Sequence, residues 1–175
     1  WIHRDELFDF SGRGRKPQMA LAEKYGIDEY SQPAGGCCFL TDESYSTKLV
    51  DLWKARGTKD YDLDDVMLLK VGRHIRPNND FKVIVAREDG EARFMQGYKK
   101  SYINMNCSSH KGPLALIDGN PSAEDLHTAA RIVARYGQGR EAEQVEVAVR
   151  DLAGNESILS VKPLAKDDLP KEWFV

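Results

Sequence analysis

The sequence has no apolar run long enough to cross a membrane, and its first residues include no short apolar segment flanked by positive charge of the kind that directs secretion. It also lacks an excess of positive charge, because 25 Lys and Arg face 28 Asp and Glu, a net charge of −3. This net charge excludes a protein that covers nucleic acid with a uniformly basic surface. We therefore expect a cytoplasmic protein with no membrane partner, in which any contact with nucleic acid is confined to a local patch.

Cysteine is also scarce: the chain has three, and two of them are the neighbours Cys37 and Cys38. Adjacent cysteines are too close for an ordinary bridge, so a disulfide scaffold is excluded and a reducing compartment fits. No cysteine or histidine has the partner spacing of a zinc site, and we expect no metal. The phosphate-binding lysine loop and the dinucleotide fingerprint are missing too. The sequence by itself shows no recognisable active site, and we expect no cofactor bound to this chain.

The 175 residues, 41% of them apolar, suffice for one domain with an appendage. Because the chain opens with Trp1 rather than methionine, we expect a piece of a longer protein. Its composition indicates three parts. Residues 1–40 are expected to be the tail of an upstream domain or a linker, residues 41–165 the folded domain, and residues 166–175 an acidic and aromatic C-terminal tail.

Hydrophobic spacing predicts several helices and strands. The clearest helix spans 123–136, where Ser122 and Asp125 resemble a capping box and Gly137 supplies a left-handed exit. Further helices are expected at 16–25, 41–56, 62–67 and 89–96, and strands at 72–76, 81–86, 102–105, 114–117, 145–149 and 158–160. The first two strands form a hairpin. The pattern predicts an α+β fold with a mainly antiparallel sheet and packed helices.

Positive charge is concentrated in one stretch of the chain. Residues 66–112 hold nine Lys and Arg against four acids, a local charge of +5, whereas residues 141–175 hold four against eight. On the predicted helix, His127, Arg131 and Arg135 share one face, and Arg140 follows its end. If this face and the hairpin point the same way, they form one groove for a nucleic-acid backbone. A local excess of positive charge is equally typical of an ordinary exposed surface that binds no nucleic acid.

The residues expected to contact RNA are all Lys, Arg or His from these two regions: Arg73, His74, Arg76, Lys82, Arg87, Lys99, Lys100, Arg131, Arg135 and Arg140. Tyr98 and Tyr102, beside the lysine pair, could stack on bases, although tyrosines in such strands are more often half-buried.

Cys37 follows Gly35 and Gly36 and could be a reactive thiol. The alternative is a small core residue at the start of a buried run.

Several motifs resemble known families. Residues 114–118, the set Leu126, Ala129, Ala130, Tyr136, Gly137 and Arg140, and residues 144–149 resemble the end of the NFACT-R RNA-binding domain of tRNA-binding ribosome quality-control proteins. Residues 82–91 are similar to the strand of that family that leads into a Gly-Arg-Asn stretch, of which Arg87 is kept between Ala86 and Glu88. The resemblance implies an NFACT-R-like fold and an RNA partner.

Residues 11–18, 32–37, Thr41, Asp42 and 68–74 resemble the C-terminal portion of PP-loop tRNA thiouridylase-like proteins. This resemblance implies a tRNA-binding module attached to an upstream nucleotide-binding domain that uses ATP for sulfur transfer. The nucleotide-binding Ser-Gly-Gly-x-Asp-Ser loop of that domain is absent from these residues, so ATP belongs upstream. In related enzymes a cysteine after the nucleotide domain carries or resolves a persulfide, and Cys37 is the position that could do so.

The leading hypothesis is therefore a noncatalytic module that positions tRNA for the catalytic domain of its own chain, the parent protein being an ATP-dependent tRNA sulfurtransferase. One alternative is that Cys37 itself carries sulfur, with a sulfur-carrier protein as a partner. Another is a protein-interaction module in which residues 167–174 dock a partner or the upstream domain.

Overall fold

A computed structural model of the chain describes residues 3–10, 14–29, 39 and 42–175. The chain divides into two compact units, Trp1–Glu43 and Ser44–Val175. The first contains the short helix η1 (Arg4–Glu6) and the helix α1 (Lys16–Lys24), and none of its described residues is buried. Gly26, with a φ of 65°, ends α1 as expected for a residue that tolerates the left-handed region. No helix in the described ranges is long and apolar enough to cross a membrane.

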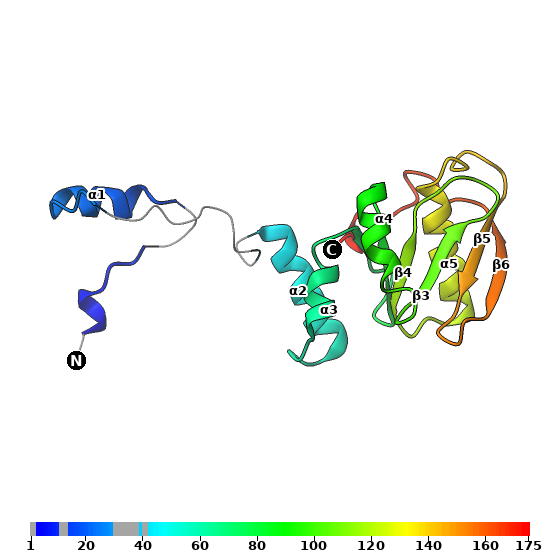
Figure 1. Cartoon of the computed structure of the whole chain (residues 1–175), viewed down its shortest axis with the longest axis horizontal. Coiled ribbons are helices and arrows are strands. Elements are labelled where there is room, and N and C mark those ends of the chain that lie inside the picture. The colour runs from blue at the N-terminus through cyan, green and yellow to red at the C-terminus, as the bar shows by residue number, and fades with distance from the viewer. Residues whose placement is uncertain (1–2, 11–13, 30–38, 40–41) are drawn as a thin grey trace. The chain divides into compact units, whose positions relative to one another are not determined.

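The second unit is built on one six-stranded sheet with the order β1-β2-β4-β3-β5-β6 (Figure 1). All neighbouring strands run antiparallel. The predicted α+β class and the predicted hairpin of the first two strands are therefore confirmed. The strands are β1 (Arg73–Ile75), β2 (Phe81–Val85), β3 (Ile103–Cys107), β4 (Ala115–Gly119), β5 (Val145–Arg150) and β6 (Glu156–Val161).

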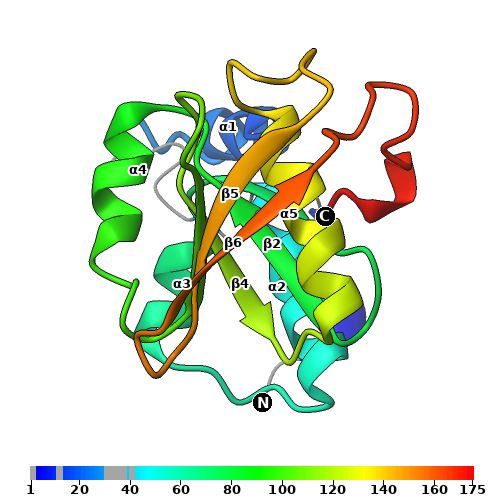
Figure 2. The same cartoon turned by 90° about the vertical axis from the view of Figure 1, so that its right-hand side faces the viewer.

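Helices pack on both faces of this sheet, with α4 (Asp89–Gln96) and α5 (Ala123–Arg135) on opposite sides of the strands (Figure 2). The larger core joins the alanine-rich face of α5 to Phe81, Val83 and other inward residues of the strands. The second core joins Met95 of α4 to Leu68 of α3 (Leu63–Leu68), as well as to Ile84 on β2. The helix α2 (Glu43–Arg56) contributes a third, smaller apolar cluster.

The ends of α5 are set by local contacts. Ser122 and Asp125 form the predicted capping box, in which the Asp125 amide donates to Ser122 Oγ at 3.2 Å and the Ser122 amide donates to Asp125 Oδ2 at 2.9 Å. The left-handed exit predicted at Gly137 is wrong, because its φ is not positive. Packing around Gly137 is tight instead, since a Cβ there would lie 3.2 Å from the sulfur of Cys107 and 3.3 Å from the carbonyl oxygen of Lys111.

Strand alternation sorts the basic residues of the hairpin between the two faces. Ile75 lies in the core under α5, so Arg73, two residues earlier, lies on that same face. His74 points to the opposite face, where its ring meets the carbonyl groups of Leu68 and Val71. One strand therefore places Arg73 and His74 in two different environments.

The C-terminal residues pack along the free edge of β1. The Arg76 amide donates to the carbonyl oxygen of Trp173 at 2.7 Å, and the Val175 amide donates to that of His74 at 3.1 Å. A bridge between Ile75 and Phe174 lies between these two bonds, and Leu169 is buried in the larger core. Residues 166–175 therefore belong to the second unit, with η3 (Lys171–Trp173) at the edge of the sheet.

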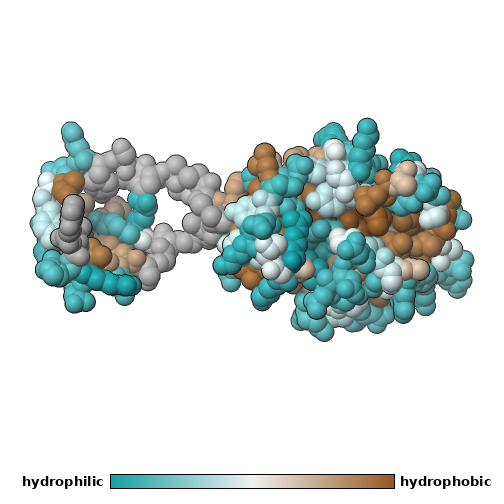
Figure 3. Space-filling model, turned by 90° about the horizontal axis from the view of Figure 1, so that it is seen from below, coloured by the Kyte–Doolittle hydropathy of each residue, from teal (hydrophilic) through white to brown (hydrophobic). Residues whose placement is uncertain are grey.

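Apolar and hydrophilic areas alternate on the face of the second unit that Figure 3 shows. Large apolar side chains that are exposed there or elsewhere on this unit belong to Val50, Tyr61, Leu63, Leu152, Ile158 and Phe174. Scattered exposure of this kind is ordinary for a folded domain, so it identifies no interface.

Candidate nucleic-acid interface

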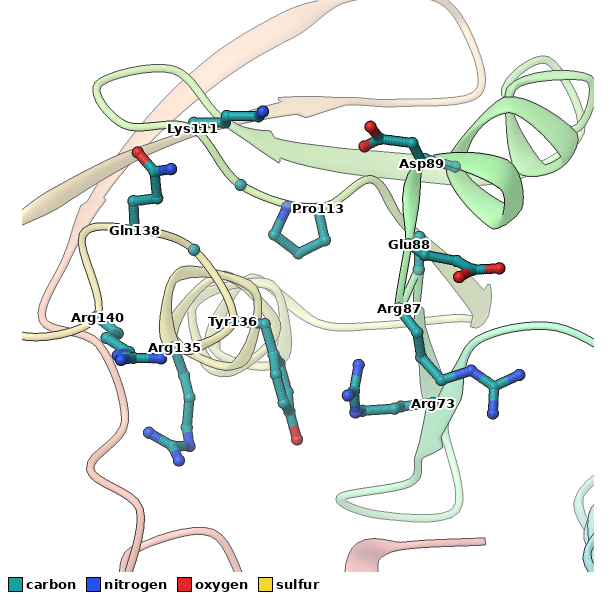
Figure 4. Close-up of a pocket in the computed structure, with 14 residues that line it drawn as sticks. Arg73, Arg87, Glu88, Asp89, Lys111, Pro113, Arg135, Tyr136, Gln138 and Arg140 are labelled. Atoms are coloured by element: carbon teal, nitrogen blue, oxygen red, sulfur yellow. The ribbon is translucent and has the colours of Figure 1, made fainter.

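A hollow of about 710 Å³ opens between the N-terminal end of α4, the loop at residues 111–113 and the C-terminal end of α5 (Figure 4). Five cationic side chains line it, against two carboxylates, and we call it the basic groove. The cations are Arg73, Arg87, Lys111, Arg135 and Arg140; the carboxylates are Glu88 and Asp89; the remaining lining residues are Ala86, Ala92, Gly112, Pro113, Tyr136, Gly137 and Gln138.

The ring of Tyr136 lies between two guanidinium groups in this groove (Figure 4). The centre of the Arg73 guanidinium is 5.0 Å from the ring centroid, and that of Arg135 is 5.9 Å away. Burial raises the pKa of the Tyr136 phenol, and the two positive charges only partly offset this effect. The ring is therefore neutral at physiological pH and holds both arginines by cation–π attraction.

Neither Arg73 nor Arg135 forms an ion pair with a carboxylate anywhere in the described ranges. A guanidinium has five N–H donors in a planar fork that matches a phosphate. Two such forks, fixed beside one ring and left without a carboxylate, provide a preformed site for an anion.

The other cations of the groove differ in how far their charge is already compensated. The Arg87 Nε donates to Glu91 Oε1 at 2.9 Å, and the backbone amide of Arg87 donates to Oε2 at 2.7 Å. Burial would raise the pKa of Glu91, but hydrogen bonds from Arg87 and from the Gly72 amide lower it to about 2. Arg140, with 66% of its side chain exposed, has only a 3.7 Å contact to Glu141. Arg87 is thus the most neutralised cation of the groove, and Arg140 remains largely available.

The walls of the groove are held by close backbone contacts. The Gln138 amide donates to the carbonyl oxygen of Lys111 at 2.8 Å, which joins the loop after α5 to the loop before β4. A Cβ on Gly112 would lie 2.7 Å from the sulfur of Cys107, so only glycine fits there without a shift. These contacts hold Lys111 and Gln138 at the rim of the groove.

A second hollow of about 590 Å³ shares Arg135 and Arg140 with the basic groove. We call it the lysine hollow, because Lys162 and Lys166 line its other side. Arg131 does not line either hollow; its Nε donates to the carbonyl oxygen of Lys162 at 3.1 Å. The amide of Leu164 donates in turn to the Arg131 carbonyl oxygen at 3.2 Å. Arg131 thus holds the lysine-bearing segment against α5.

The structure brings together four of the residues predicted to contact RNA, namely Arg73, Arg87, Arg135 and Arg140. It buries two others. His74 is 1% exposed; burial and the nearby charges of Lys82 and Lys48 lower its pKa to about 3. The Lys82 ammonium lies 3.3 Å from Asp51 and 3.6 Å from Asp118. The prediction that His74 and Lys82 contact RNA is wrong, because strand alternation turns both into the protein interior.

Arg76 lies on the same buried side. Its Nη2 donates to Asp51 Oδ2 at 2.9 Å, and only 13% of its side chain is exposed. We call Asp51, Arg76, Lys82 and Asp118 the buried ion network. Burial lowers the pKa of Lys82, while Asp118 and Asp51 raise it. Burial would raise the pKa of Asp51, but Arg76 and Lys82 lower it. The charge of Arg76 is thus compensated within the fold, and Arg76 lines neither hollow.

Lys99 and Lys100 follow the C-terminal end of α4, whereas its N-terminal end lines the basic groove. An eight-residue helix is about 12 Å long, so the two lysines lie outside the groove. Tyr98 and Tyr102 pack in the second core with their ring centroids 6.4 Å apart. The half-buried interpretation of these tyrosines is therefore the correct one.

Sequence reasoning did not select five residues of the two hollows as contacts: Lys111, Tyr136, Gln138, Lys162 and Lys166. The available signal was the position of Tyr136 directly after Arg135 at the end of the basic helix. Cys37 lies outside the described residues. Within the described ranges, no group of three His, Cys, Asp or Glu side chains could hold a metal ion.

Comparison with known protein families identifies the family of this domain. Residues 72–174 match the family described as the NFACT protein RNA binding domain. Among solved structures, the C-terminal part of the fibronectin/fibrinogen-binding protein from Streptococcus suis is similar, with 17% sequence identity and a TM-score of 0.49. The alignment covers 60% of this chain and 50% of that one, so this chain spans about half of its length. No curated protein matches. Because the family match extends over more than half of the 175 residues of this chain, the chain belongs to the NFACT RNA-binding domain family.

Proposed function

We propose that this chain binds RNA in the basic groove and positions tRNA for an ATP-dependent sulfur-transfer domain of the same protein. The observation that carries the first part is the pair of arginines, Arg73 and Arg135, that flank Tyr136 without a carboxylate partner in the described ranges. Both lie within the region that matches an RNA-binding family.

Phosphate contacts would provide most of the affinity. Arg135 and Arg140 border both hollows, and Lys111 lies at the rim of one of them, so several phosphates can be met along one path. Such contacts release counterions from RNA, which makes the affinity fall steeply as salt rises. They position the RNA without reading its sequence.

The second part of the proposal is supported by the resemblance of residues 11–18, 32–37 and 68–74 to PP-loop tRNA thiouridylase-like proteins. In that setting tRNA is the RNA partner and ATP is used by the upstream domain. Cys37 is the candidate sulfur carrier, and a sulfur-carrier protein is its candidate donor.

The test is binding of bulk unmodified tRNA to the 175-residue chain over a salt series. The double variant Arg135→Gln, Arg140→Gln should bind about tenfold more weakly at low salt, and the slope of log affinity against log salt should fall by roughly 1.5 to 2. The matched control is Arg93→Gln, Arg150→Gln, which removes the same charge from exposed residues outside both hollows. Equal loss in the two double variants would contradict a binding site in the groove.

A further inference from the structure

We infer that the two hollows form the path of a single, unpaired RNA strand, with one base in the basic groove and the backbone passing over Arg135 and Arg140 into the lysine hollow. This inference rests on the proposed function and adds the class of RNA that the site accepts. Four features of the described residues support it: the distribution of charge, the apolar floor, the continuity of the hollows and their size.

Charge is distributed unevenly around the basic groove. Arg135, Arg140 and Lys111 lie on the side of α5 and the 111–113 loop, whereas Glu88 and Asp89 lie on the side of α4, together with Arg87, whose charge Glu91 already compensates. The carboxylate of Asp89 points across the mouth toward Lys111 (Figure 4). A phosphate backbone is attracted to the first side and repelled from the second. A double helix brings two backbones, so one of them would face the carboxylates; a single strand avoids this.

The floor of the groove is partly apolar. Ala86, Ala92 and Pro113 line it together with the Tyr136 ring. Phosphates gain nothing from such a surface, whereas an unpaired base does, because RNA-binding proteins stack exposed bases on aromatic rings and on guanidinium planes. Because Arg73 and Arg135 flank the Tyr136 ring, the surface for a base is the outer plane of the Arg73 guanidinium, which the ring holds in place at 5.0 Å. A paired base in a helix is already stacked on its neighbours and cannot enter.

The lysine hollow continues the path past Arg135 and Arg140, and its lining has four cationic side chains and one carboxylate, Glu141, which lies 3.7 Å from Arg140. Arg135 lines both hollows, but Arg73 lines only the basic groove. This difference assigns Arg135 to the backbone and Arg73 to the base. Lys162 and Lys166 then meet the next phosphates, and Arg131 keeps their segment in place through its contact with the Lys162 carbonyl oxygen.

The size of the two hollows fits this assignment. At about 710 and 590 Å³, each lies in the range of roughly 300 to 1,000 Å³ that is typical of sites for small ligands. A nucleotide is a ligand of that size. A helix could touch only the exposed rims at Lys111 and Arg140, leaving the Arg73–Tyr136 pair without a contact.

The experiment compares two probes on the 175-residue chain by fluorescence anisotropy: a labelled 12-nucleotide RNA of mixed sequence without self-complementarity, and the same strand annealed to its complement. We expect the single strand to bind about tenfold more tightly at equal salt. Replacing its central bases with abasic sites should remove most of this advantage, because the phosphates stay and the stacking is lost.

Variants of the protein separate base from backbone. Tyr136→Leu should weaken single-strand binding about tenfold and duplex binding much less, whereas Tyr136→Phe keeps the ring that holds the two arginines and should retain the preference for the single strand. The double variant Lys162→Gln, Lys166→Gln should weaken binding of the single strand, and the single strand should remain the more tightly bound of the two probes. Thermal unfolding of each variant checks the fold, and the abasic probe gives an answer that needs no variant.

Two outcomes would overturn the inference in distinguishable ways. In the first, both probes bind with equal affinity and the double variant Arg135→Gln, Arg140→Gln binds neither. This result would overturn the single-strand path but leave RNA binding at the groove standing. No binding of either probe at low salt would overturn both proposals.

Discussion

The basic groove and the buried ion network use the same residue types for opposite purposes. Arg73 and Arg76 are three residues apart, yet Arg73 lies on a tyrosine ring in an open groove and Arg76 on Asp51 in the interior. What separates them is the presence of a carboxylate opposite the guanidinium. A cation that already has a buried partner is part of the fold, and a cation without one is available for a ligand.

The network also shows why basic sequence stretches overstate binding surfaces. Of the hairpin residues that raise the local charge to +5, Arg76 and Lys82 are compensated by Asp51, which comes from α2. The two cations of the basic groove without a carboxylate partner in the described ranges, Arg73 and Arg135, come instead from β1 and α5, which lie far apart in the chain. The following predictions separate the two regions, beginning with the largest expected effect.

Removing the shared carboxylate of the network should have the largest effect on stability. Asp51→Ala would leave Arg76 without a carboxylate and Lys82 with Asp118 alone, and we expect the free energy of unfolding to fall by about 3 to 5 kcal/mol. Urea denaturation measures the change. RNA affinity of the folded protein should stay the same; a loss of RNA affinity under conditions where the variant is folded would contradict the separation of the two regions.

Two neighbouring arginines give the sharpest comparison. Arg76→Gln should lower the free energy of unfolding by about 2 to 3 kcal/mol without changing RNA affinity, because it breaks a buried pair. Arg73→Gln should change unfolding by less than about 1 kcal/mol but weaken RNA binding about fivefold to tenfold, because it removes one side of the ring stack. Each variant serves as the control of the other, and similar profiles for both would disprove the distinction.

The burial of His74 predicts an acid dependence of stability. Its pKa is about 3 in the folded chain against 6.5 for the free group, since burial and the charges of Lys82 and Lys48 oppose protonation. The unfolded chain therefore binds a proton that the folded chain refuses. Stability is fully present above pH 6.5 and is lost as the pH falls toward 3, by at most about 1.4 kcal/mol per pH unit.

Unfolding curves at pH 7, 6 and 5 test this dependence, because Glu91 and Asp51 stay ionised in the folded protein over that window. His74→Gln should flatten the profile between pH 6.5 and 5. An equally steep profile in the variant would assign the effect to other groups.

The smallest effect is expected at Lys99 and Lys100. They follow the end of α4 that lies away from the groove, so Lys99→Gln with Lys100→Gln should change the affinity for RNA by less than about twofold. The salt series used for tRNA measures it. A fall as large as that of Arg135→Gln, Arg140→Gln would extend the interface beyond the two hollows.

Local pattern was enough for much of the fold. The capping box at Ser122 and Asp125, the apolar stripe of α5 and the turn between β1 and β2 all depend on residues close in sequence. The exit at Gly137 was the exception among these signals. The space at Gly137 is limited by Cys107 and by the Lys111 carbonyl group of another loop, which no local pattern contains.

The site was only partly predictable for the same reason. Arg135 and Arg140 could be selected from one helix and its end, and Arg73 from a basic strand. The sequence alone determined the α+β class, the order of helices and strands and the presence of surplus positive charge at residues 66–112, because spacing and composition are local properties. Only the tertiary structure decided which of these charges stays free. That depends on whether Asp51 and Asp118 lie opposite a given cation, and on β1 and α5 meeting at Tyr136, and such contacts join residues far apart in the chain.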